Sequence, residues 1–224
     1  MNRPNTNSSI IRTASDFDQI NTWIFDLDNT LYPVTKKLLT QIDQHMGNFV
    51  ANFLNVDKEE ARHIQKSYFR DYGLTLRGLM LHHGLDPSRY YDEMTPMDLT
   101  EVYPNPALAD AIRQLPGRKL IYTNASTNHA EMVLDRLAMK NIFEGIFDII
   151  SAEYVPKPEI ESYKLLCKLN DIDPTHAVMI DDIARNLEPA AALGMTTVWI
   201  QTNVDWAQNI ELEPFINHVI EDIL

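Results

Sequence analysis

The sequence predicts an α/β fold with a parallel sheet and a block of helices inserted after the first strand. Five short apolar runs recur along the chain, and amphipathic helical segments separate the last four, which is the pattern of a parallel sheet with crossover helices. About ninety residues lie between the first run and the second, far more than a strand-to-helix connection requires. This interval shows helical spacing without strand alternation, so it predicts the insert.

The expected strands are apolar on both faces, as strands that helices cover on two sides tend to be. They have the sequences TWIFDL (22–27), KLIYTN (119–124), IFDIIS (146–151), AVMIDD (177–182) and TTVWIQ (196–201). The expected core helices carry cap residues at their starts, an early proline, or a glycine at the end. They have the sequences NPALADAIRQL (105–115), TNHAEMVLDRLAM (127–139), KPEIESYKLLCKL (157–169) and NLEPAAALGM (186–195).

Four further helical segments fill the long interval, with apolar residues at helical spacing. They have the sequences KKLLTQIDQHMGNFVANFL (36–54), KEEARHIQKSYFRDY (58–72), TLRGLMLHHGL (75–85) and PSRYYDEM (87–94). We therefore expect three parts: a flexible polar tail at 1–20, a core formed by 21–31 and 104–224, and a helical insert at 32–103.

The composition excludes several classes of protein. A net charge of −13 argues against binding to a nucleic-acid polymer, which would need a basic face. No apolar run approaches the ~18 residues of a membrane span, and the first residues lack the apolar part of a secretory signal. The single cysteine, Cys167, lies in a helical pattern and fits a buried structural thiol in a reducing compartment. We expect a soluble cytoplasmic protein that is a monomer or a dimer and has no membrane partner.

Polar side chains gather where the predicted strands end. Ligands of parallel sheets bind beyond the carboxyl ends of the strands. Each residue there has an ordinary explanation if taken singly, such as a turn or a helix cap, but their joint placement predicts a site. The set comprises four carboxylates, a hydroxyl, an amide and a lysine: Asp26, Asp28, Asp181, Asp182, Thr123, Asn124 and Lys157.

These residue types suit phosphoryl transfer. Clustered carboxylates repel unless a hard cation such as Mg²⁺ neutralises them. One carboxylate can attack phosphorus and form an aspartyl-phosphate, and a second can protonate the leaving group and then deprotonate water. A lysine and a hydroxyl can bind the phosphoryl oxygens.

In order along the chain, FDLDNT, IYTN, a proline-flanked lysine and IDD resemble the four motifs of the haloacid dehalogenase superfamily. The insert resembles the cap domain in that superfamily's first insertion position. The resemblance implies a Rossmann-like core and a requirement for Mg²⁺. It implies that Asp26 is the nucleophile and that Asp28 is the general acid/base and gives its main-chain carbonyl to the metal. Thr123 and Lys157 would bind phosphate, with Asn124 beside them.

The fourth motif, IDDIARN, leaves two roles open. It resembles the form in which the second acidic residue binds the metal, which favours Asp182 over Asp181 and gives Asp26, Asp28 and Asp182 as the metal site. Asn186 stands where many relatives have another aspartate. Its role is either to orient Lys157 or to hold a metal-bound water.

The insert resembles the cap of the pyrimidine 5′-nucleotidase family in YFRDYGLTLRGLMLHHGL and in the YPNPAL segment that follows. On this resemblance Tyr72, Thr75, Arg77 and Gly78 lie near the substrate, where an aromatic ring and hydrogen-bond donors would suit a pyrimidine base. The alternative is that these residues only pack the cap helices. The neighbouring histidines at 82–83 diverge on a helix and are expected to be solvated.

We expect a Mg²⁺-dependent phosphomonoesterase acting on pyrimidine nucleoside 5′-monophosphates. Alternatives within the superfamily are a small-sugar phosphatase, a phosphomutase or a dehalogenase, and Asp28 disfavours the last because dehalogenases generally lack that acid. A different class is a non-catalytic phosphate-binding module or a phosphoryl-accepting receiver. Receivers carry the acidic pair on the first strand and the accepting aspartate on a middle one, the reverse of the order here.

Overall fold

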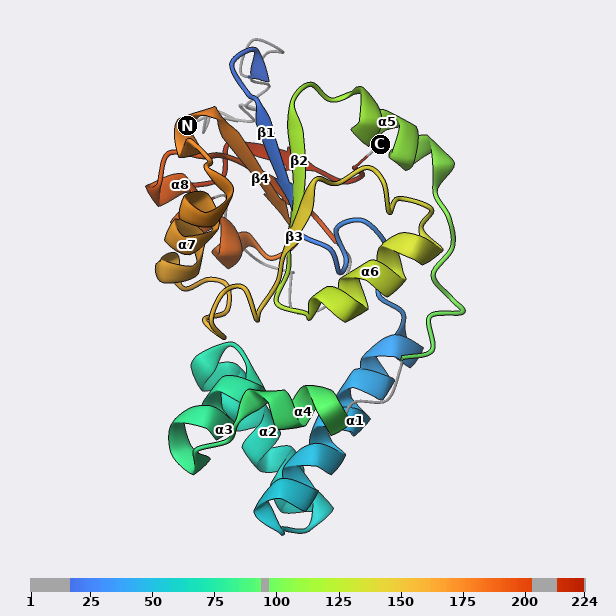
Figure 1. Cartoon of the computed structure of the whole chain (residues 1–224), viewed down its shortest axis with the longest axis vertical. Helices are drawn as coiled ribbons and strands as arrows, with labels where there is room; N and C mark the ends of the chain where they lie inside the picture. Colours follow the sequence, from blue (N-terminus) through green and yellow to red (C-terminus); the bar gives the residue numbers. More distant parts are fainter. Residues whose placement is uncertain (1–16, 94–96, 203–212, 224) are drawn as a thin grey trace, which may run out of the picture.

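The computed structural model describes residues 17–93, 97–202 and 213–223, and most of the expected tail at 1–20 lies outside them. A six-stranded sheet, parallel throughout, forms its centre in the order β3-β2-β1-β4-β5-β6. This confirms the predicted fold class and places the first strand of the sequence in the middle of the sheet (Figure 1). The strands are β1 (Thr22–Phe25), β2 (Arg118–Tyr122), β3 (Gly145–Phe147), β4 (Ala177–Asp181), β5 (Thr196–Ile200) and β6 (His218–Ile220).

Helices cover both faces of the sheet, as the apolar strands require. Figure 1 shows helices on both sides of the sheet. On one face Phe25 and Ile180 belong to an apolar cluster with residues of α5 (Pro106–Gln114) and α6 (Thr127–Arg136). On the other face Ile24 and Met179 belong to a second cluster with residues of α7 (Ile160–Asn170) and α8 (Leu187–Ala192). Every residue of β1 and β4 is buried, so the two central strands are fixed by apolar packing on two sides.

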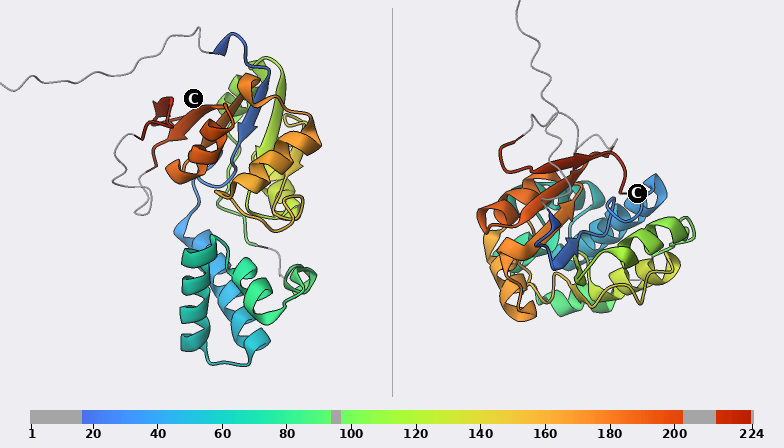
Figure 2. Two further views of the ribbon diagram at one scale, coloured as in Figure 1. Left: turned by 90° about the vertical axis from the view of Figure 1, so that its left-hand side faces the viewer. Right: turned by 90° about the horizontal axis from the view of Figure 1, so that it is seen from above.

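The helical insert comprises α1 (Lys36–Leu54), α2 (Lys58–Tyr72), α3 (Thr75–His83) and α4 (Pro87–Glu93). It has an apolar cluster of its own that includes Phe49, Leu76 and Leu79. Figure 2 shows the insert standing apart from the helices that cover the sheet, on the side toward which the strands run in Figure 1. None of the helices in the described part of the chain is long and apolar enough to cross a membrane.

The two connections between insert and core are tied together. Leu38, in the first turn of α1, packs in the apolar cluster that contains Phe25 and Ile180. Gln41 exchanges two hydrogen bonds with the main chain of Asp98, of 3.3 and 2.9 Å, and Lys37 forms an ion pair with the Asp98 carboxylate at 2.6 Å. The base of α1 is therefore anchored to the sheet, while its far end belongs to the insert.

The strands end earlier than the apolar runs predict. β1 stops at Phe25, so Asp26 and Asp28 lie in the segment that follows the strand. The carbonyl of Leu27 there accepts the main-chain N–H of Leu31 at 2.9 Å, which turns the chain. β6 was not predicted, because a three-residue edge strand leaves no apolar pattern to detect. Helix α6 is capped by Ser126, one residue before the helical segment predicted at 127–139.

Candidate functional site

The central strands bring three carboxylates together at their carboxyl ends. Asp26 follows β1, and its main-chain N–H donates to the carbonyl of Ile180 in β4 at 2.9 Å. Asp181 ends β4, and Asp182 follows it. One carboxylate oxygen from each of Asp26, Asp181 and Asp182 lies within 4.8 Å of the other two, and all three residues are buried. The pairing of β1 with β4 therefore produces an acidic cluster from residues far apart in the sequence.

Lys157 crosses this cluster from the loop between β3 and α7. Its Nζ lies 2.7 Å from Asp26 Oδ1, 2.7 Å from Asp181 Oδ2 and 3.1 Å from the carbonyl oxygen of Tyr122. Its side chain is 2% exposed. An ammonium group has three N–H donors, and here each has an acceptor. The buried lysine is therefore satisfied only as a cation between two carboxylates.

Two asparagines hold the lysine and its partner. The side-chain oxygen of Asn124 accepts the main-chain N–H of Lys157 at 2.8 Å, and its amide donates to the Lys157 carbonyl at 3.4 Å. Asn186 donates to both carboxylate oxygens of Asp181, at 3.0 and 3.2 Å. Asn186 therefore acts on Lys157 through Asp181, whereas a contact between Asn124 and phosphate stays a prediction.

Asp182 differs from Asp181 in having a free ligand atom. Asp181 is bonded through both oxygens, to Lys157, to Asn186 and to a main-chain N–H at 2.8 Å. Asp182 Oδ2 is buried and has no hydrogen-bond partner among the described residues. A buried carboxylate oxygen without a donor is costly unless a cation reaches it. The donor set, all carboxylate oxygens, is the one that Mg²⁺ prefers.

Burial and mutual repulsion make the cluster resist full ionisation. Burial, together with the charges of Asp181 and Asp28, outweighs the attraction of Lys157 and raises the pKa of Asp26 to about 7. Burial and the charges of Asp26 and Asp181 raise the pKa of Asp182 to about 8. Burial opposes the charge of Lys157, but Asp181 and Asp26 prevail and hold its pKa above the ordinary value. Near neutral pH, a divalent cation would therefore replace protons at this site.

Asp28 lies beside the cluster and has different partners. Its Oδ1 accepts the hydroxyl of Tyr32, and the ring Nε2 of His129 lies 3.5 Å from the same oxygen. Its side chain is 33% exposed. Burial alone would raise the pKa of Asp28, but the hydrogen bond and charge of His129 and the hydrogen bond of Tyr32 hold that pKa below its ordinary value. The carboxylate of Asp28 is not part of the buried cluster formed by Asp26, Asp181 and Asp182.

Two threonine hydroxyls complete the core part of the site. Thr123 is 2% exposed, and its Oγ1 accepts the main-chain N–H of Ala125 at 3.0 Å. Its hydroxyl proton is not used in that bond and can be donated to a ligand oxygen. Thr30 donates to Asp26 Oδ2 at 3.2 Å, so both oxygens of Asp26 are held.

Of the insert residues expected near the substrate, one reaches the core and two form hydrogen bonds within the insert. Arg77 crosses from α3 to the core, where its guanidinium donates to the carbonyl of Tyr154 at 3.1 Å. The hydroxyl of Thr75 is buried and donates to the carbonyl of Gln65 within the insert. Tyr72 is hydrogen-bonded to His82. Of these three expected residues, Arg77 is the one with a hydrogen bond to the core.

The remaining expected residues of the insert, Gly78 and the histidine pair, make contacts inside it. A methyl group on Gly78 would overlap the ring of Tyr68, so the glycine allows α2 and α3 to pack closely. The two histidines are exposed, as expected, and each is hydrogen-bonded to a tyrosine, His82 to Tyr72 and His83 to Tyr68.

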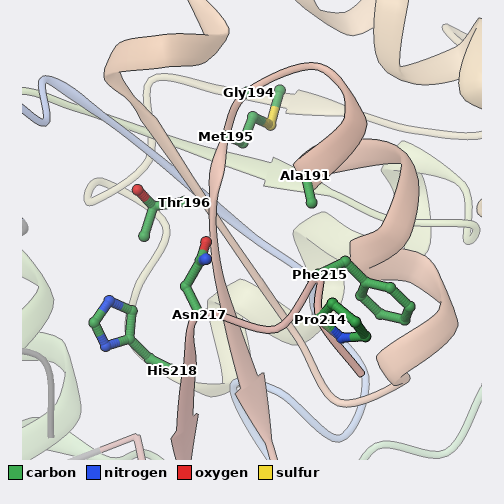
Figure 3. A pocket seen from close by; sticks show the side chains of 8 residues that line it. All are labelled: Ala191, Gly194, Met195, Thr196, Pro214, Phe215, Asn217 and His218. Atoms are coloured by element: carbon green, nitrogen blue, oxygen red, sulfur yellow. The ribbon is translucent and has the colours of Figure 1, made fainter. Parts of the chain in front are cut away.

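A pocket of about 460 Å³ lies at the other end of the sheet (Figure 3). It is lined by residues such as Gly194, Thr196, Phe215 and His218. Thr196 begins β5 and His218 begins β6, whereas Asp26 and Asp181 stand at the carboxyl ends of their strands. This pocket is therefore separate from the carboxylate cluster.

Comparison with known proteins assigns this arrangement to a family. The model of the haloacid dehalogenase-like hydrolases matches residues 20–194, which contain both the cluster and the insert. The chain belongs to the haloacid dehalogenase-like hydrolases. The superfamily resemblance read from the four motifs is thereby confirmed, while the pyrimidine 5′-nucleotidase resemblance of the insert stays a prediction.

Proteins similar to this hydrolase include one that is named for phosphate metabolism and, by fold, one that is named as a phosphatase. Phosphate metabolism protein 8 of Saccharomyces cerevisiae is 30% identical over 192 residues, which are 77% of this chain and 59% of the yeast protein. The chain thus spans about three fifths of that relative. A HAD phosphatase from Thermococcus onnurineus has the same fold, with a TM-score of 0.55, 17% identity and coverage of 91% of this chain and 94% of that one.

A further structural neighbour was determined with magnesium. YfnB from Bacillus subtilis matches with a TM-score of 0.52 and 15% identity, over 91% of this chain and 95% of that chain. At this identity the likeness shows the fold alone.

Three side chains that contact aspartate carboxylates in the described part of this hydrolase were not predicted from the sequence: Thr30, Tyr32 and His129. Thr30 lies in the FDLDNT motif, where its hydroxyl could have been suspected. Tyr32 and His129 stand in an ordinary turn and an ordinary helix, and a lone aromatic or histidine there carries no distinctive spacing. Only the fold shows that both reach Asp28.

Proposed function

We propose that this hydrolase releases phosphate from phosphomonoesters through an aspartyl-phosphate on Asp26. The observation that carries the proposal is the buried Lys157 ammonium, 2.7 Å from Asp26 Oδ1, at the carboxyl ends of β1 and β4. A cation in that position would attract a phosphate dianion toward the carboxylate that attacks it. Thr123, with its spare hydroxyl proton, supplies a further donor at the same sheet edge.

The reaction has two steps, each with balanced bonds. A carboxylate oxygen of Asp26 attacks phosphorus, the bond to the ester oxygen breaks, and the protonated form of Asp28 gives its proton to the departing alkoxide. Water then attacks the phosphorus of the aspartyl-phosphate and loses its proton to Asp28, which restores both carboxyl groups and releases phosphate. Before the first step, the Lys157 ammonium must move its hydrogen bond from Asp26 Oδ1 to a phosphoryl oxygen, so that the Asp26 oxygen can attack.

We propose Mg²⁺ as the cofactor, held by the side chains of Asp26 and Asp182 and by the main-chain carbonyl of Asp28. When bound, the cation offsets the negative charge of the carboxylates and the phosphoryl group. The free Oδ2 of Asp182 supports this assignment, and so does the full hydrogen bonding of Asp181.

Cation binding should therefore depend on pH and on Asp182. The raised pKa values of Asp26 and Asp182 mean that the folded protein keeps protons that the unfolded chain has released. Without a cation, stability should fall as pH rises from about 4 to about 8. Added Mg²⁺ should raise the melting temperature more at pH 8 than at pH 6, because fewer protons must be displaced.

Two variants distinguish the acidic neighbours. Asp182→Ala should raise the Mg²⁺ concentration that gives half-maximal activity by at least about tenfold, and it should remove most of the Mg²⁺-dependent thermal shift. Asp181→Ala should lower activity through Lys157 and leave the Mg²⁺ requirement closer to that of the wild type. A larger change in the Mg²⁺ requirement for Asp181→Ala would show that the ligand assignment is wrong.

The substrate class we propose is the pyrimidine nucleoside 5′-monophosphates, with the insert acting as a cap. In this proposal the core binds the phosphoryl group, so selectivity among leaving groups would come from other segments. Arg77 crosses from the insert to Tyr154, three residues before Lys157, and its planar group suits a pyrimidine carbonyl. A methyl group on Gly73 would lie 3.5 Å from the Lys157 carbonyl, so the turn between α2 and α3 also lies close to the lysine loop.

Phosphate release from a panel of esters, with and without Mg²⁺, tests the function. The panel should include uridine, cytidine and purine 5′-monophosphates, a sugar phosphate and p-nitrophenyl phosphate. We expect Mg²⁺-dependent release, with the pyrimidine esters preferred. Arg77→Ala should lower kcat/KM for the pyrimidine esters by roughly 1 to 3 kcal/mol, the scale of a hydrogen bond to a charged group, and hardly affect p-nitrophenyl phosphate.

Several outcomes would contradict parts of this proposal. If Arg77→Ala lowered kcat/KM equally for the pyrimidine esters and for p-nitrophenyl phosphate, the role of Arg77 would be to pack the insert. Purine esters hydrolysed as well as pyrimidine esters would exclude the proposed substrate class, and preference for the sugar phosphate would favour a small-sugar phosphatase. No release from any ester would refute the phosphatase function.

A further inference from the structure

The carboxyl group of Asp28 is held on one side only. The hydroxyl of Tyr32 and the Nε2 of His129 both point at Oδ1, and no hydrogen bond from the described residues reaches Oδ2. Because a carboxylate accepts, both partners must be the donors. Two donors on one oxygen fix the rotation of the carboxyl group about its bond to the chain and leave the second oxygen for another ligand.

The two donors are built into the fold independently of each other. Tyr32 is brought back beside Asp28 by the turn after β1, where the two residues form an isolated parallel bridge. In the same turn the side chain of Asn29 accepts the main-chain N–H of Val34 at 2.9 Å. Tyr32 itself is 6% exposed and packs in the apolar cluster that contains Phe25 and Ile180, so its ring cannot easily turn away from Asp28.

His129 comes from a different element, in the first turn of α6. Ser126 caps this helix by accepting the main-chain N–H of His129 at 3.4 Å, and Asp148 accepts that of Thr127 at 2.8 Å. These bonds fix the start of the helix that carries the histidine. The His129 side chain is 12% exposed, less than the 33% of Asp28, so the donor is more deeply buried than the carboxylate it meets.

We infer that Tyr32 and His129 are positioning residues that orient Asp28 so that its Oδ2 exchanges the proton with the leaving group and with water. The inference rests on the proposed phosphatase function, because it deepens the role of Asp28 in that reaction. Neither residue touches Asp26, Lys157 or Asp182 in the hydrogen bonds of the described chain. Their loss should therefore impair the proton transfer and leave phosphate binding intact.

Leaving groups of different basicity separate this role from a structural one. Phenyl phosphate and p-nitrophenyl phosphate are similar in shape, but phenolate is much more basic than nitrophenolate and depends more on protonation as it leaves. Tyr32→Phe and His129→Ala should each lower kcat/KM, which reports only the steps up to formation of the aspartyl-phosphate, about ten- to a hundredfold more for phenyl phosphate than for p-nitrophenyl phosphate. His129→Gln, whose amide can donate, should recover part of the loss.

Controls keep the test decisive. Tyr32→Phe removes a single oxygen from a packed ring, so this variant should fold and test the inference even if His129→Ala does not fold. His176→Ala removes a histidine that lies 3.0 Å from Asp173, before β4 at the other end of the sheet, and should change neither substrate. Equal losses of kcat/KM on both esters in Tyr32→Phe and His129→Gln would overturn the inference alone. No hydrolysis of either ester by the wild type would refute the proposed function and the inference together.

Discussion

Asp26→Asn is expected to abolish turnover and leave the folded protein intact. The amide has nearly the size of the carboxyl group, and its oxygen can still accept from Lys157 while its nitrogen donates to the hydroxyl of Thr30. It cannot attack phosphorus as a carboxylate does. Loss of a covalent nucleophile should lower kcat/KM for p-nitrophenyl phosphate at least about a thousandfold.

The measurement combines activity, melting temperature and trapping of the intermediate. Wild-type protein quenched in acid during turnover of a radiolabelled phosphate ester should retain label, and Asp26→Asn should retain none. Asp110→Asn is the matched control, because Asp110 is exposed on α5 and forms a surface pair with Arg113. Activity of Asp26→Asn within about tenfold of wild type, which is ~1.4 kcal/mol in the barrier, would exclude a phosphoaspartate at this position.

Lys157→Met should damage stability and catalysis together. Methionine fills similar space but leaves the buried carboxylates of Asp26 and Asp181 without their common cation. Removing one partner of a buried ion pair costs about 3 to 5 kcal/mol, because the remaining charge is left uncompensated. Catalysis should fall by roughly a hundredfold or more, since a charge that stabilises the phosphoryl group is also lost.

The sign of the pH dependence identifies the cause. In Lys157→Met the orphaned carboxylates can avoid their cost by binding protons, so the loss of stability should be larger at pH 8 than at pH 5. Urea unfolding in the presence of a chelator measures this without interference from bound cations. Lys164→Met, on the exposed side of α7, is the control and should be neutral. A loss that is equal at both pH values would attribute the effect of Lys157→Met to packing.

The apolar runs were sufficient to predict the class of fold. Strands such as AVMIDD are apolar on both faces, and that property follows from the covalent sequence alone. The rule that ligands bind at the carboxyl ends of parallel strands then selects Asp26, Lys157 and Asp181 from the sequence alone. The boundaries were less well predicted, since β1 ends two residues before the apolar run does.

The sequence by itself determined which chemical groups this protein carries and the order in which the strands deliver them. Only the tertiary structure decided which groups meet. In the folded protein Asp181 accepts hydrogen bonds from Lys157 and Asn186, whereas Asp182 Oδ2 has no donor among the described residues, although the two aspartates are neighbours in the chain. Tyr32 and His129, ninety-seven positions apart, were likewise brought to one oxygen of Asp28. The physical reason is that hydrogen bonds and charges act over a few ångströms of space, and those distances are fixed by how the helices pack on the sheet.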